Sequence, residues 1–330
     1  MDADAPLCEG STTAVTWRPT ATLPTLQKRA ELLTQVRRFF LQRAVLEVDV
    51  PVLQGGANLD PSVEPFSVLT PDGRRFLPTS PEHPLKRLVA AGYGAVWAMA
   101  PVFRAHEKGR RHAPEFRMLE WYRPGWDDGK LLSEVLDLFD TVSGLGTNHE
   151  VLGYRDAFRR FVGIDPVHVT TAELVRLMGE QANVAVSPDG TIDRLVALDL
   201  LLSERIEPHL GRGQWTGLTD YPLHVAAQAR LRADDDEQLV AARFEIYRDG
   251  LELANGYWEL TDAKELAGRL AAELAQRGDA TLARDQRFEA AMAHGLPDCA
   301  GVAVGFDRLM MIALGLDTVS ATQAFAAGNE

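Results

Sequence analysis

Two short polar segments, residues 103–107 and 111–123, constrain this chain most. They concentrate arginines, a histidine, carboxylates and aromatic side chains on either side of Lys108-Gly109-Arg110, which we interpret as a mobile connection. Guanidinium groups match phosphate oxygens, an adjacent aromatic ring can stack on a base, and a carboxylate just beyond can hold an ammonium group. One hairpin can therefore bind a nucleotide and an amino acid side by side. A surface hairpin laced with salt bridges explains the same residues about as well.

A second segment, residues 301–315, favours the nucleotide interpretation. Its pattern predicts a short strand, a turn at Gly305 and then a helix. Glycine lets the backbone approach a ligand closely, and Arg308 falls in the first turns of the helix, where free N–H groups already favour an anion. A buried strand–helix corner with Arg308 paired to Asp307 is the plainer alternative, but it leaves an arginine at that corner unexplained.

These segments resemble motifs two and three of the class II aminoacyl-tRNA synthetases, most closely of the lysyl branch. A candidate for motif one precedes them: residues 26–44 place apolar side chains at helical spacing, and residues 45–50 alternate as a strand that stops at Pro51. The resemblance runs from about Leu26 to Leu316 with the motifs in order. It implies an α+β fold with a mostly antiparallel sheet flanked by helices, and a homodimer formed through motif one.

Length and composition agree with a compact cytoplasmic enzyme. The 330 residues are 46% hydrophobic, enough for a sizeable core. We expect a loose tail over residues 1–22 and one catalytic domain over residues 23–330, because no interior linker rich in Gly, Ser or Pro divides the chain. No apolar run reaches membrane-spanning length, and no signal peptide opens the sequence. Two cysteines, Cys8 and Cys299, argue against a disulfide framework or a zinc site.

The net charge argues against a tight nucleic-acid partner. It is −13, from 34 basic and 47 acidic residues, whereas phosphate contacts usually need a basic face. Lysyl synthetases also carry an anticodon-binding barrel ahead of motif one, which the ~25 residues before motif one here cannot build. We therefore expect no stable tRNA binding and no membrane association, although the overall charge leaves room for a local basic patch.

The middle of the chain predicts helices with a structural role. Thr170 and Glu173 form a capping-box pattern, residues 192–206 are apolar at helical spacing, and residues 262–277 alternate charged residues and alanine in a helical manner. The function of residues 150–210 stays open.

Residues 242–254 predict a second hairpin, with its turn at residues 248–250. Because side chains alternate between the faces of a strand, Glu245 and Glu252 should share one face. Two carboxylates on one face repel each other unless a cation lies between them, and Mg²⁺ suits such a site when phosphates supply its other ligands. Two solvated carboxylates on an outer face are the alternative, which the polar residues that follow the hairpin weaken.

The resemblance implies a role for each matching residue. Arg104 and Arg308 would be catalytic, with Arg104 on the α-phosphate of ATP and Arg308 on the β- and γ-phosphates, and Phe116 would stack on adenine. The ATP site would comprise Arg104, His106, Glu107, His112, Phe116, Glu245, Glu252, Leu253, Gly305 and Arg308. Glu245 and Glu252 would also hold the metal. The amino-acid pocket would comprise Ser80, Glu82, Glu120, Tyr122, Asn255, Glu259 and Ala303.

The carboxylates of this pocket indicate its substrate. A buried carboxylate is costly unless it is paired, so the side-chain ammonium of a lysine-like substrate would offset Glu259. A neutral amino acid would leave Glu259 unpaired, which would select against it. For residues 79–82 a plain turn and helix start is the alternative. The resemblance instead places Ser80 and Glu82 near the second amino group of the substrate.

Two further runs, residues 120–124 and 297–303, resemble a free-standing subgroup of the lysyl branch. That subgroup activates (R)-β-lysine as an adenylate and joins it to the ε-amino group of a lysine on translation elongation factor P. The resemblance implies ATP, Mg²⁺, lysine or β-lysine, and elongation factor P as ligands and partners. A synthetase that charges tRNA or another acceptor and a non-catalytic binding paralogue are the alternatives.

Ala303 supports the subgroup, because true lysyl synthetases have glycine there. One extra methyl group beside the amino end of an unsuited ligand costs about 1–3 kcal/mol, and moving that amino group to the β carbon can relieve the clash. Neutral drift is the alternative. Three other positions depart from the family pattern: His106 replaces Glu, Ala113 replaces Asn and Arg117 replaces Thr. Either Glu107 takes over the contact to the adenine amino group or that contact is lost.

Overall fold

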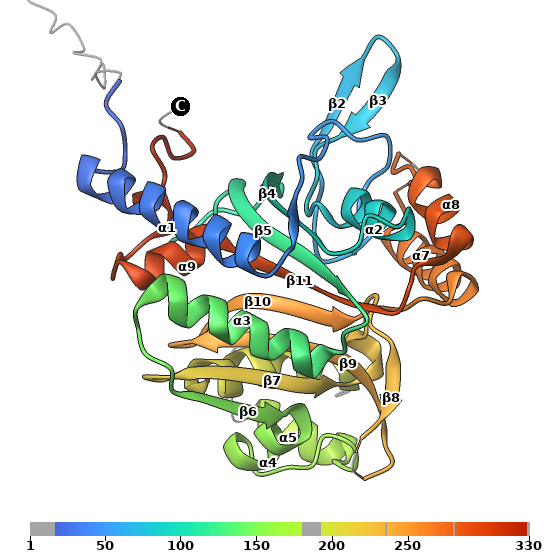
Figure 1. Cartoon of the computed structure of the whole chain (residues 1–330). Helices are drawn as coiled ribbons and strands as arrows, with labels where there is room; N and C mark the ends of the chain where they lie inside the picture. Colours follow the sequence, from blue (N-terminus) through green and yellow to red (C-terminus); the bar gives the residue numbers. More distant parts are fainter. Residues whose placement is uncertain (1–16, 180–192, 235, 280, 329–330) are drawn as a thin grey trace, which may run out of the picture.

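The computed structural model describes residues 17–179, 193–234, 236–279 and 281–328, and a large sheet forms its centre (Figure 1). The described strands are β1 (Leu46–Glu47), β2 (Ser67–Thr70), β3 (Gly73–Phe76), β4 (Val96–Phe103), β5 (Glu115–Pro124), β6 (His149–Gly153), β7 (Trp215–Tyr221), β8 (Leu231–Ala233), β9 (Leu239–Arg248), β10 (Leu251–Trp258) and β11 (Cys299–Gly305). The order in the large sheet is β1-β4-β5-β11-β10-β9-β7-β6, with β8 paired to β9. In the described residues β1–β4 and β6–β7 are parallel and the other strand pairs are antiparallel, which confirms the expected α+β class.

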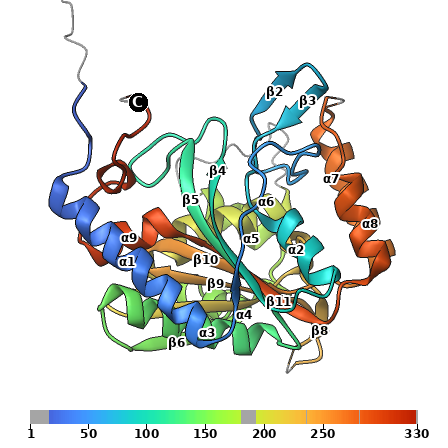
Figure 2. The same cartoon turned by 45° about the horizontal axis from the view of Figure 1, so that its top comes forward.

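Helices pack around this sheet. They are α1 (Leu23–Gln42), α2 (Glu82–Ala90), α3 (Asp128–Ser143), α4 (Tyr154–Phe161), α5 (Thr171–Gly179), α6 (Arg194–Leu201), α7 (Ala263–Arg277), α8 (Gln286–Gly295) and α9 (Phe306–Ala313), with the short helical segments η1 (Leu202–Ile206), η2 (Glu207–His209), η3 (Leu223–Val225) and η4 (Val319–Thr322). In both views α1 and α9 lie at one end of the molecule and α2, α7 and α8 at the other (Figures 1 and 2). No helix in the described part of the chain is both long and apolar enough to cross a membrane.

Alternation along the central strands separates the core from the opposite face of the sheet. On β5, Leu119 and Trp121 are buried in the core cluster that contains α1, α3 and α9 side chains. Val302 and Val304 of β11 join the same cluster. Successive side chains of a strand point to opposite faces, so the residues between these four face away from the helices. Because apolar residues pack against the helices on one face of the sheet, they also determine which residues lie on the opposite face, where a site can form.

The predicted helices are confirmed, with local differences. Thr170 and Glu173 exchange the expected capping-box hydrogen bonds at the start of α5. The apolar run at 192–206 forms α6 and then the π-helical η1, and residue 192 lies outside the described residues. Residues 262–277 form α7, which begins after its N-cap Asp262.

The strand predicted over residues 45–50 is wrong in length. Regular pairing covers Leu46 and Glu47, and the Val48 N–H still donates to the Trp97 carbonyl oxygen at 2.9 Å. The chain leaves β4 after this bond. The predicted tail falls mainly on residues 1–16, which lie outside the described residues. The backbones of Thr20 and Ala21 bond to residues 323–324, so this end of the predicted tail is tied to the body.

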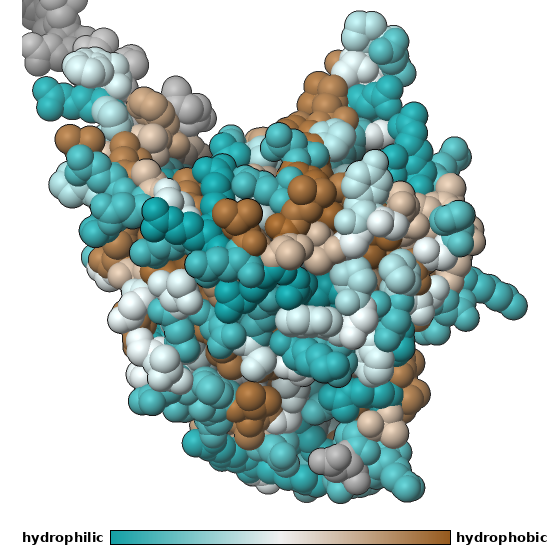
Figure 3. Space-filling view, in the orientation of Figure 1, coloured by the Kyte–Doolittle hydropathy of each residue, from teal (hydrophilic) through white to brown (hydrophobic). Residues whose placement is uncertain are grey.

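An arm formed by β2 and β3 stands clear of the body in the space-filling view (Figure 3). Its two strands pair with each other from Ser67–Phe76 to Thr70–Gly73, and Phe76 at the base of the arm also forms an isolated bridge to Gln54. The segment before the arm, residues 57–63, runs back along the body and contributes to the cavity described next.

Candidate active site

A cavity of about 710 Å³ lies on the face of the sheet away from α1, α3 and α9, and it collects the predicted site residues. All of them except His106 line it. The lining residues from the prediction are Ser80, Glu82, Arg104, Glu107, His112, Phe116, Glu120, Tyr122, Glu245, Glu252, Leu253, Asn255, Glu259, Ala303, Gly305 and Arg308. Segments more than 200 residues apart in sequence therefore form one site, as Arg104 and Arg308 show.

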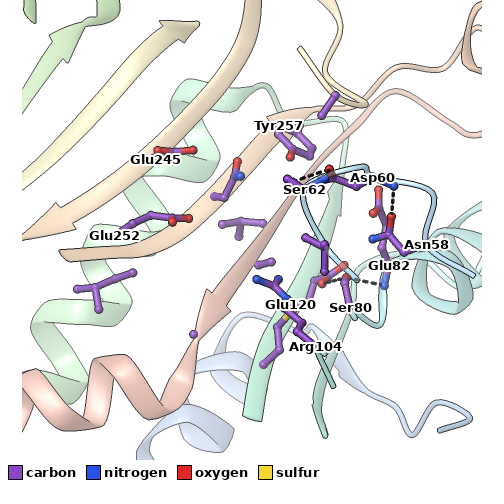
Figure 4. Close-up of a pocket in the computed structure, with 18 of the residues that line it drawn as sticks. Asn58, Asp60, Ser62, Ser80, Glu82, Arg104, Glu120, Glu245, Glu252 and Tyr257 are labelled. Atoms are coloured by element: carbon purple, nitrogen blue, oxygen red, sulfur yellow. Dashed lines mark hydrogen bonds between the residues drawn. The ribbon is translucent and has the colours of Figure 1, made fainter. Parts of the chain in front are cut away.

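The sheet register orders these side chains. Glu120, Ala303, Asn255 and Glu245 are successive Cα partners across β5, β11, β10 and β9. Neighbouring strands are about 4.8 Å apart, so this row spans about 14 Å from the Glu120 backbone to that of Glu245. Both ends of the row line the cavity, and Figure 4 shows Glu245 and Glu252 on one side of it with Glu120 on the other.

Arg308 is held at one end of the cavity by three hydrogen bonds. Its Nε donates to the Arg111 carbonyl oxygen at 3.1 Å, its Nη1 to the Glu252 carbonyl oxygen at 3.0 Å, and its Nη2 lies 2.7 Å from Nε2 of His112. Partial burial and then the charge of Arg308 lower the pKa of His112, which favours the neutral ring as acceptor. The plainer alternative of an Arg308–Asp307 pair is wrong, because the Asp307 carboxylate binds Arg29 instead.

Arg104 lies beside the aromatic ring of Phe116. The centre of its guanidinium group is 5.2 Å from the ring centroid, and its Nη1 is 3.5 Å from the Glu107 carboxylate. His106 does not reach the cavity. Its backbone has a φ of 65°, in the left-handed region, and the next residue, Glu107, lines the cavity instead. The carboxylate of Glu107, and not the His106 ring, is therefore the side chain of this pair that lines the cavity.

Glu245 and Glu252 share one face, as the alternation predicts. Glu252 pairs with Tyr247 and Asn255 with Glu245, with a bulge between Glu252 and Ala254. Glu245 accepts hydrogen bonds from the hydroxyls of Tyr221 and Tyr247 at 2.6 and 2.5 Å, and Arg243 also pairs with it. Burial and then the charge of Glu245 raise the pKa of Glu252 to about 7. This repulsion is what a bound cation would relieve.

These two carboxylates fit a magnesium ion that is partly held by a ligand. No group of three or more His, Cys, Asp or Glu side chains in the described residues forms a complete metal site. Mg²⁺ commonly takes one or two carboxylates together with phosphate oxygens and water. The pair therefore suits a metal that arrives with a triphosphate.

The opposite end of the cavity is acidic and buried. The Ser80 hydroxyl donates to one oxygen of Glu120 at 2.6 Å, and the Tyr122 hydroxyl donates to the other at 2.7 Å. Burial and then the charge of Glu82 raise the pKa of Glu120 to about 8, so Glu120 is largely protonated at pH 7. The amide oxygen of Asn255 is also buried and has no hydrogen-bond partner within the described residues. A donor from a ligand would satisfy the Asn255 oxygen.

Lys86, which sequence reasoning missed, pairs with carboxylates at this end of the cavity. Its ammonium lies 2.7 Å from the Glu259 carboxylate and 2.6 Å from that of Glu82, and it donates to the Gln228 amide oxygen at 3.0 Å. Lys86 and Glu259 are each only 1% exposed. Burial lowers the pKa of Lys86, but the charges of Glu259 and Glu82 outweigh it and raise that pKa above its usual range.

The expectation that Glu259 is unpaired without a substrate is therefore wrong, because the chain supplies its own ammonium. The sequence indicates one of these two contacts of Lys86. Lys86 follows Glu82 by four residues, a spacing that places both side chains on one face of helix α2. Nothing in the sequence shows that Glu259, at the end of β10, lies next to that helix.

Gly301 and the segment of residues 57–63 shape the acidic end. A Cβ atom at Gly301 would overlap the Tyr122 ring and the Glu259 carboxylate, so only glycine fits at this point of β11. Asn58, Asp60 and Ser62 line the cavity as well, from a segment that sequence reasoning did not single out (Figure 4). Arg277 of α7 holds that segment, because its guanidinium group donates to the backbone carbonyls of residues 59, 60 and 63.

The chain is similar to known proteins over nearly its whole length. The family description tRNA synthetases class II (D, K and N) matches residues 11–329. A protein of Avibacterium paragallinarum named elongation factor P--(R)-beta-lysine ligase is 39% identical over 322 residues, covering 95% of this chain and 98% of that protein. Proteins with the same name from Salmonella paratyphi A and Salmonella dublin are each 40% identical over 319 residues, covering 94% of this chain and 97% of theirs.

Proposed function

The chain belongs to the class II tRNA synthetases (D, K and N), and from this we propose that it ligates (R)-β-lysine to a lysine of elongation factor P in an ATP-dependent reaction. It is a ligase whose relatives along nearly the whole chain carry that name. The observation that carries the proposal is the single cavity, which joins Arg104 and Arg308 at one part to the buried carboxylates at another. ATP and a diamino acid have complementary places in it.

The first step is the activation of the amino acid. A carboxylate oxygen of the substrate attacks the α-phosphorus of ATP, the new O–P bond forms, and the bond to pyrophosphate breaks. Arg104 stabilises charge on the α-phosphate, while Arg308 and the neutral His112 bind the leaving phosphates. Phe116 stacks on adenine and fixes its orientation. The residues supply position and charge, so the step requires no covalent bond to the protein.

Glu245 and Glu252 would hold Mg²⁺ together with oxygens of the triphosphate. The ion, when bound, supplies positive charge that offsets the charge on the phosphates. The tyrosine hydroxyls on Glu245 orient that carboxylate before any ligand binds. The peptide carbonyl of Glu252 is meanwhile bonded to Arg308, which ties the metal carboxylates to the phosphate-binding arginine.

The charges of the acidic end suit a substrate with two ammonium groups. Glu82, Glu120 and Glu259 lie around the single ammonium group of Lys86, and Asp60 and Glu273 line the same cavity, so carboxyl groups outnumber the ammonium group. An excess of carboxylates suits the two ammonium groups of a lysine-like amino acid. An amino acid with one ammonium group would leave a buried carboxylate without its partner, or protonated.

Ala303 supports β-lysine over α-lysine. It lies in register between Glu120 and Asn255, and its side chain lines the cavity. A methyl group at this position narrows the space beside the amino end of the substrate. An amino group on the β carbon, one atom further along the chain, avoids that methyl group.

The second step transfers the activated acyl group. The ε-amino nitrogen of a lysine on elongation factor P attacks the carbonyl carbon of the adenylate, a new C–N bond forms, and the C–O bond to AMP breaks. The ammonium group of the acceptor lysine loses two protons to solvent in all, one before its nitrogen attacks and one as the amide forms, and AMP leaves as the phosphate anion. Activation and transfer share one cavity, so the acceptor lysine must reach the row that contains Glu120 and Ala303.

A homodimer and the absence of stable tRNA binding complete the proposal. Leu41 and Leu46, in the motif-one region, are 79% and 50% exposed, which is expected of a surface that a second copy covers. The net charge of −13 supports a protein rather than a tRNA acceptor. Neither statement depends on the chemistry of the cavity.

Acceptor labelling tests the proposal directly. The protein is incubated with ATP, Mg²⁺ and (R)-β-lysine, and with either elongation factor P or bulk tRNA, and each acceptor is weighed by mass spectrometry. We expect elongation factor P to gain one β-lysyl group and tRNA to gain none. A variant of elongation factor P whose acceptor lysine is replaced by arginine is the control. No gain on the wild-type acceptor, with ATP–pyrophosphate exchange intact, would overturn the choice of acceptor but not the activation step.

A further inference from the structure

We infer that Arg29, on helix α1 and outside the cavity, is a positioning residue for the ATP site that acts through Asp307. The inference rests on the proposed use of ATP. It concerns a residue that does not line the cavity and therefore touches no substrate. Arg29 and Asp307 are 278 residues apart in sequence, so only the folded chain brings them together.

The Arg29 guanidinium group is enclosed by the C-terminal part of the chain. Its Nη1 lies 2.5 Å from the Asp307 carboxylate, 3.3 Å from the Thr322 carbonyl oxygen and 3.4 Å from the sulfur of Met310. The centre of the group is 5.2 Å from the Phe306 ring centroid. The side chains of Arg29 and Asp307 are 17% and 3% exposed, so this ion pair is shielded from water.

Asp307 uses its second carboxylate oxygen to hold the strand that carries the adenine-binding residue. That oxygen accepts the backbone N–H of Arg117 at 3.0 Å and the side-chain amide of Gln323 at 3.4 Å. Arg117 directly follows Phe116 on β5. The other neighbour, Arg308, directly follows Asp307 on α9. One carboxylate thus fixes the backbone beside Phe116 and beside Arg308.

Arg29 also supports the loop that joins β4 to β5, through a second series of hydrogen bonds. It donates to the carbonyl oxygen of Thr322 in η4, and the first residue of η4, Val319, donates its backbone N–H to the carbonyl oxygen of Arg110 at 2.9 Å. The next residue, Arg111, gives the carbonyl oxygen that receives the Arg308 Nε. Both routes from Arg29 therefore end at groups that orient Arg308.

The geometry predicts a defect that is specific to ATP. Without the Arg29 charge, the buried Asp307 carboxylate loses its cation and can turn, and its bond to the Arg117 N–H weakens. Phe116 and Arg308 then move relative to each other. The amino-acid end is not attached to this network, because its carboxylates are held by Ser80, Tyr122 and Lys86.

The test uses the full chain and ATP–pyrophosphate exchange, with ATP and (R)-β-lysine varied in turn. Arg29→Met is compared with Lys28→Met, which removes an exposed ammonium group one residue away, and with Arg29→Lys, which keeps the charge. We expect Arg29→Met to raise the KM for ATP on the order of tenfold, because small misplacements of binding groups are costly. The KM for the amino acid should stay within about twofold of wild type. Arg29→Lys should recover part of the affinity, and Lys28→Met should match wild type.

Asp307→Asn provides the second readout, because it removes the charge and keeps the shape. If Arg29 acts through Asp307, Arg29→Met should raise the KM for ATP much less in the Asp307→Asn background than in wild type. An equal rise in both backgrounds would overturn the inference. So would a lower melting temperature with unchanged KM for ATP, or an equal rise in both KM values. Should Arg29→Met fail to fold, Arg29→Lys in the two backgrounds decides the same question.

The wild-type protein separates this inference from the proposed function. Direct binding of Mg–ATP to wild type is measured by calorimetry before any variant is compared. If wild type binds no ATP, the proposed function fails. If wild type and Arg29→Met bind ATP equally well, the proposed function stands and only the role of Arg29 is refuted. Light scattering on each variant shows whether the mass of the assembly is unchanged.

Discussion

Replacing Lys86 by methionine should destabilise the protein by an amount that depends strongly on pH. Methionine has a similar length and no charge, so the change removes the ammonium group from Glu82 and Glu259 and leaves most of the packing. Removing one partner of a buried ion pair typically costs about 3–5 kcal/mol. Both Lys86 and Glu259 are 1% exposed, so water cannot replace the lost charge at Glu259.

The magnitude follows from the cost of protonating the carboxylate that is left behind. The usual pKa of a glutamate is about 4.3, and one pH unit corresponds to about 1.4 kcal/mol, so a protonated Glu259 at pH 7 costs the folded variant about 3.7 kcal/mol relative to its unfolded chain. Wild type bears part of this cost, because burial raises the pKa of its Glu259 to about 7. At pH 5 the same step costs about 1 kcal/mol. The folded variant binds one more proton than its unfolded chain above pH ~4.3, so its stability falls as the pH rises, up to the raised pKa of the carboxyl group.

Urea unfolding of wild type and Lys86→Met at pH 5, 6, 7 and 8 measures this difference. Burial raises the pKa of Glu259 to about 7 in wild type as well, so the two proteins should differ little in pH dependence at pH 5 and 6, and the difference in unfolding free energy should grow toward about 1.4 kcal/mol per unit above pH 7. Glu120 titrates in both proteins and largely cancels. Lys28→Met, which removes an exposed ammonium group, is the control and should show almost no loss. A loss that is the same at every pH would mean that Lys86 contributes packing only, and it would refute the charge argument.

Three further predictions concern the cavity. The affinity for (R)-β-lysine should rise with pH up to about 8, because Glu120 must release its proton to bind an ammonium group, and Glu120→Gln should flatten this dependence in KM measurements between pH 6 and 9. Ala303→Gly should reduce the preference for (R)-β-lysine over α-lysine by about tenfold in competitive pyrophosphate exchange, and an unchanged ratio would show that the methyl group does not discriminate. Arg308→Met should lower kcat/KM for exchange by about 100-fold without changing the melting temperature by more than a few degrees, and near-normal exchange would remove Arg308 from the phosphate site.

The parts of the site that sequence reasoning predicted depend on near neighbours in the chain. Glu245 and Glu252 share a face because a short turn and strict alternation leave few other arrangements. The capping box at Thr170 and Glu173 is likewise local, since the two residues are three positions apart. At residues 301–315 the alternation of a strand is followed directly by the signals for a turn and for the start of a helix. These features could be predicted because each of them depends on residues that lie within a few positions of one another in the sequence.

What sequence reasoning missed depends on contacts between distant segments. Lys86 and Glu259 meet only because α2 packs beside the end of β10, and no periodicity in either segment shows it. Arg29 and Asp307 are a similar case across nearly the whole chain. We assigned His106 to the ATP site by its place in the motif. Its backbone lies in the left-handed region, and Glu107 lines the cavity in its place. A pattern fixes residue types, whereas the direction of a side chain also depends on the backbone that carries it.

The proposed adenylate is a mixed anhydride that acylates amines, and Lys86 keeps an amine of the protein within a few ångströms of the carboxylates proposed to bind the substrate. The Lys86 nitrogen lies 2.6 Å from the Glu82 carboxylate, 2.7 Å from the Glu259 carboxylate and 3.0 Å from the Gln228 amide oxygen. Burial lowers its pKa, but the charges of Glu259 and Glu82 raise that pKa above the usual range, so the nitrogen stays an ammonium group with no lone pair for attack on the adenylate. The three acceptor residues around this ammonium group thus also keep the nearest amine of the protein unreactive. Chemical selectivity between the enzyme's own lysine and that of its partner protein then follows from protonation state, with no barrier needed to keep the two apart.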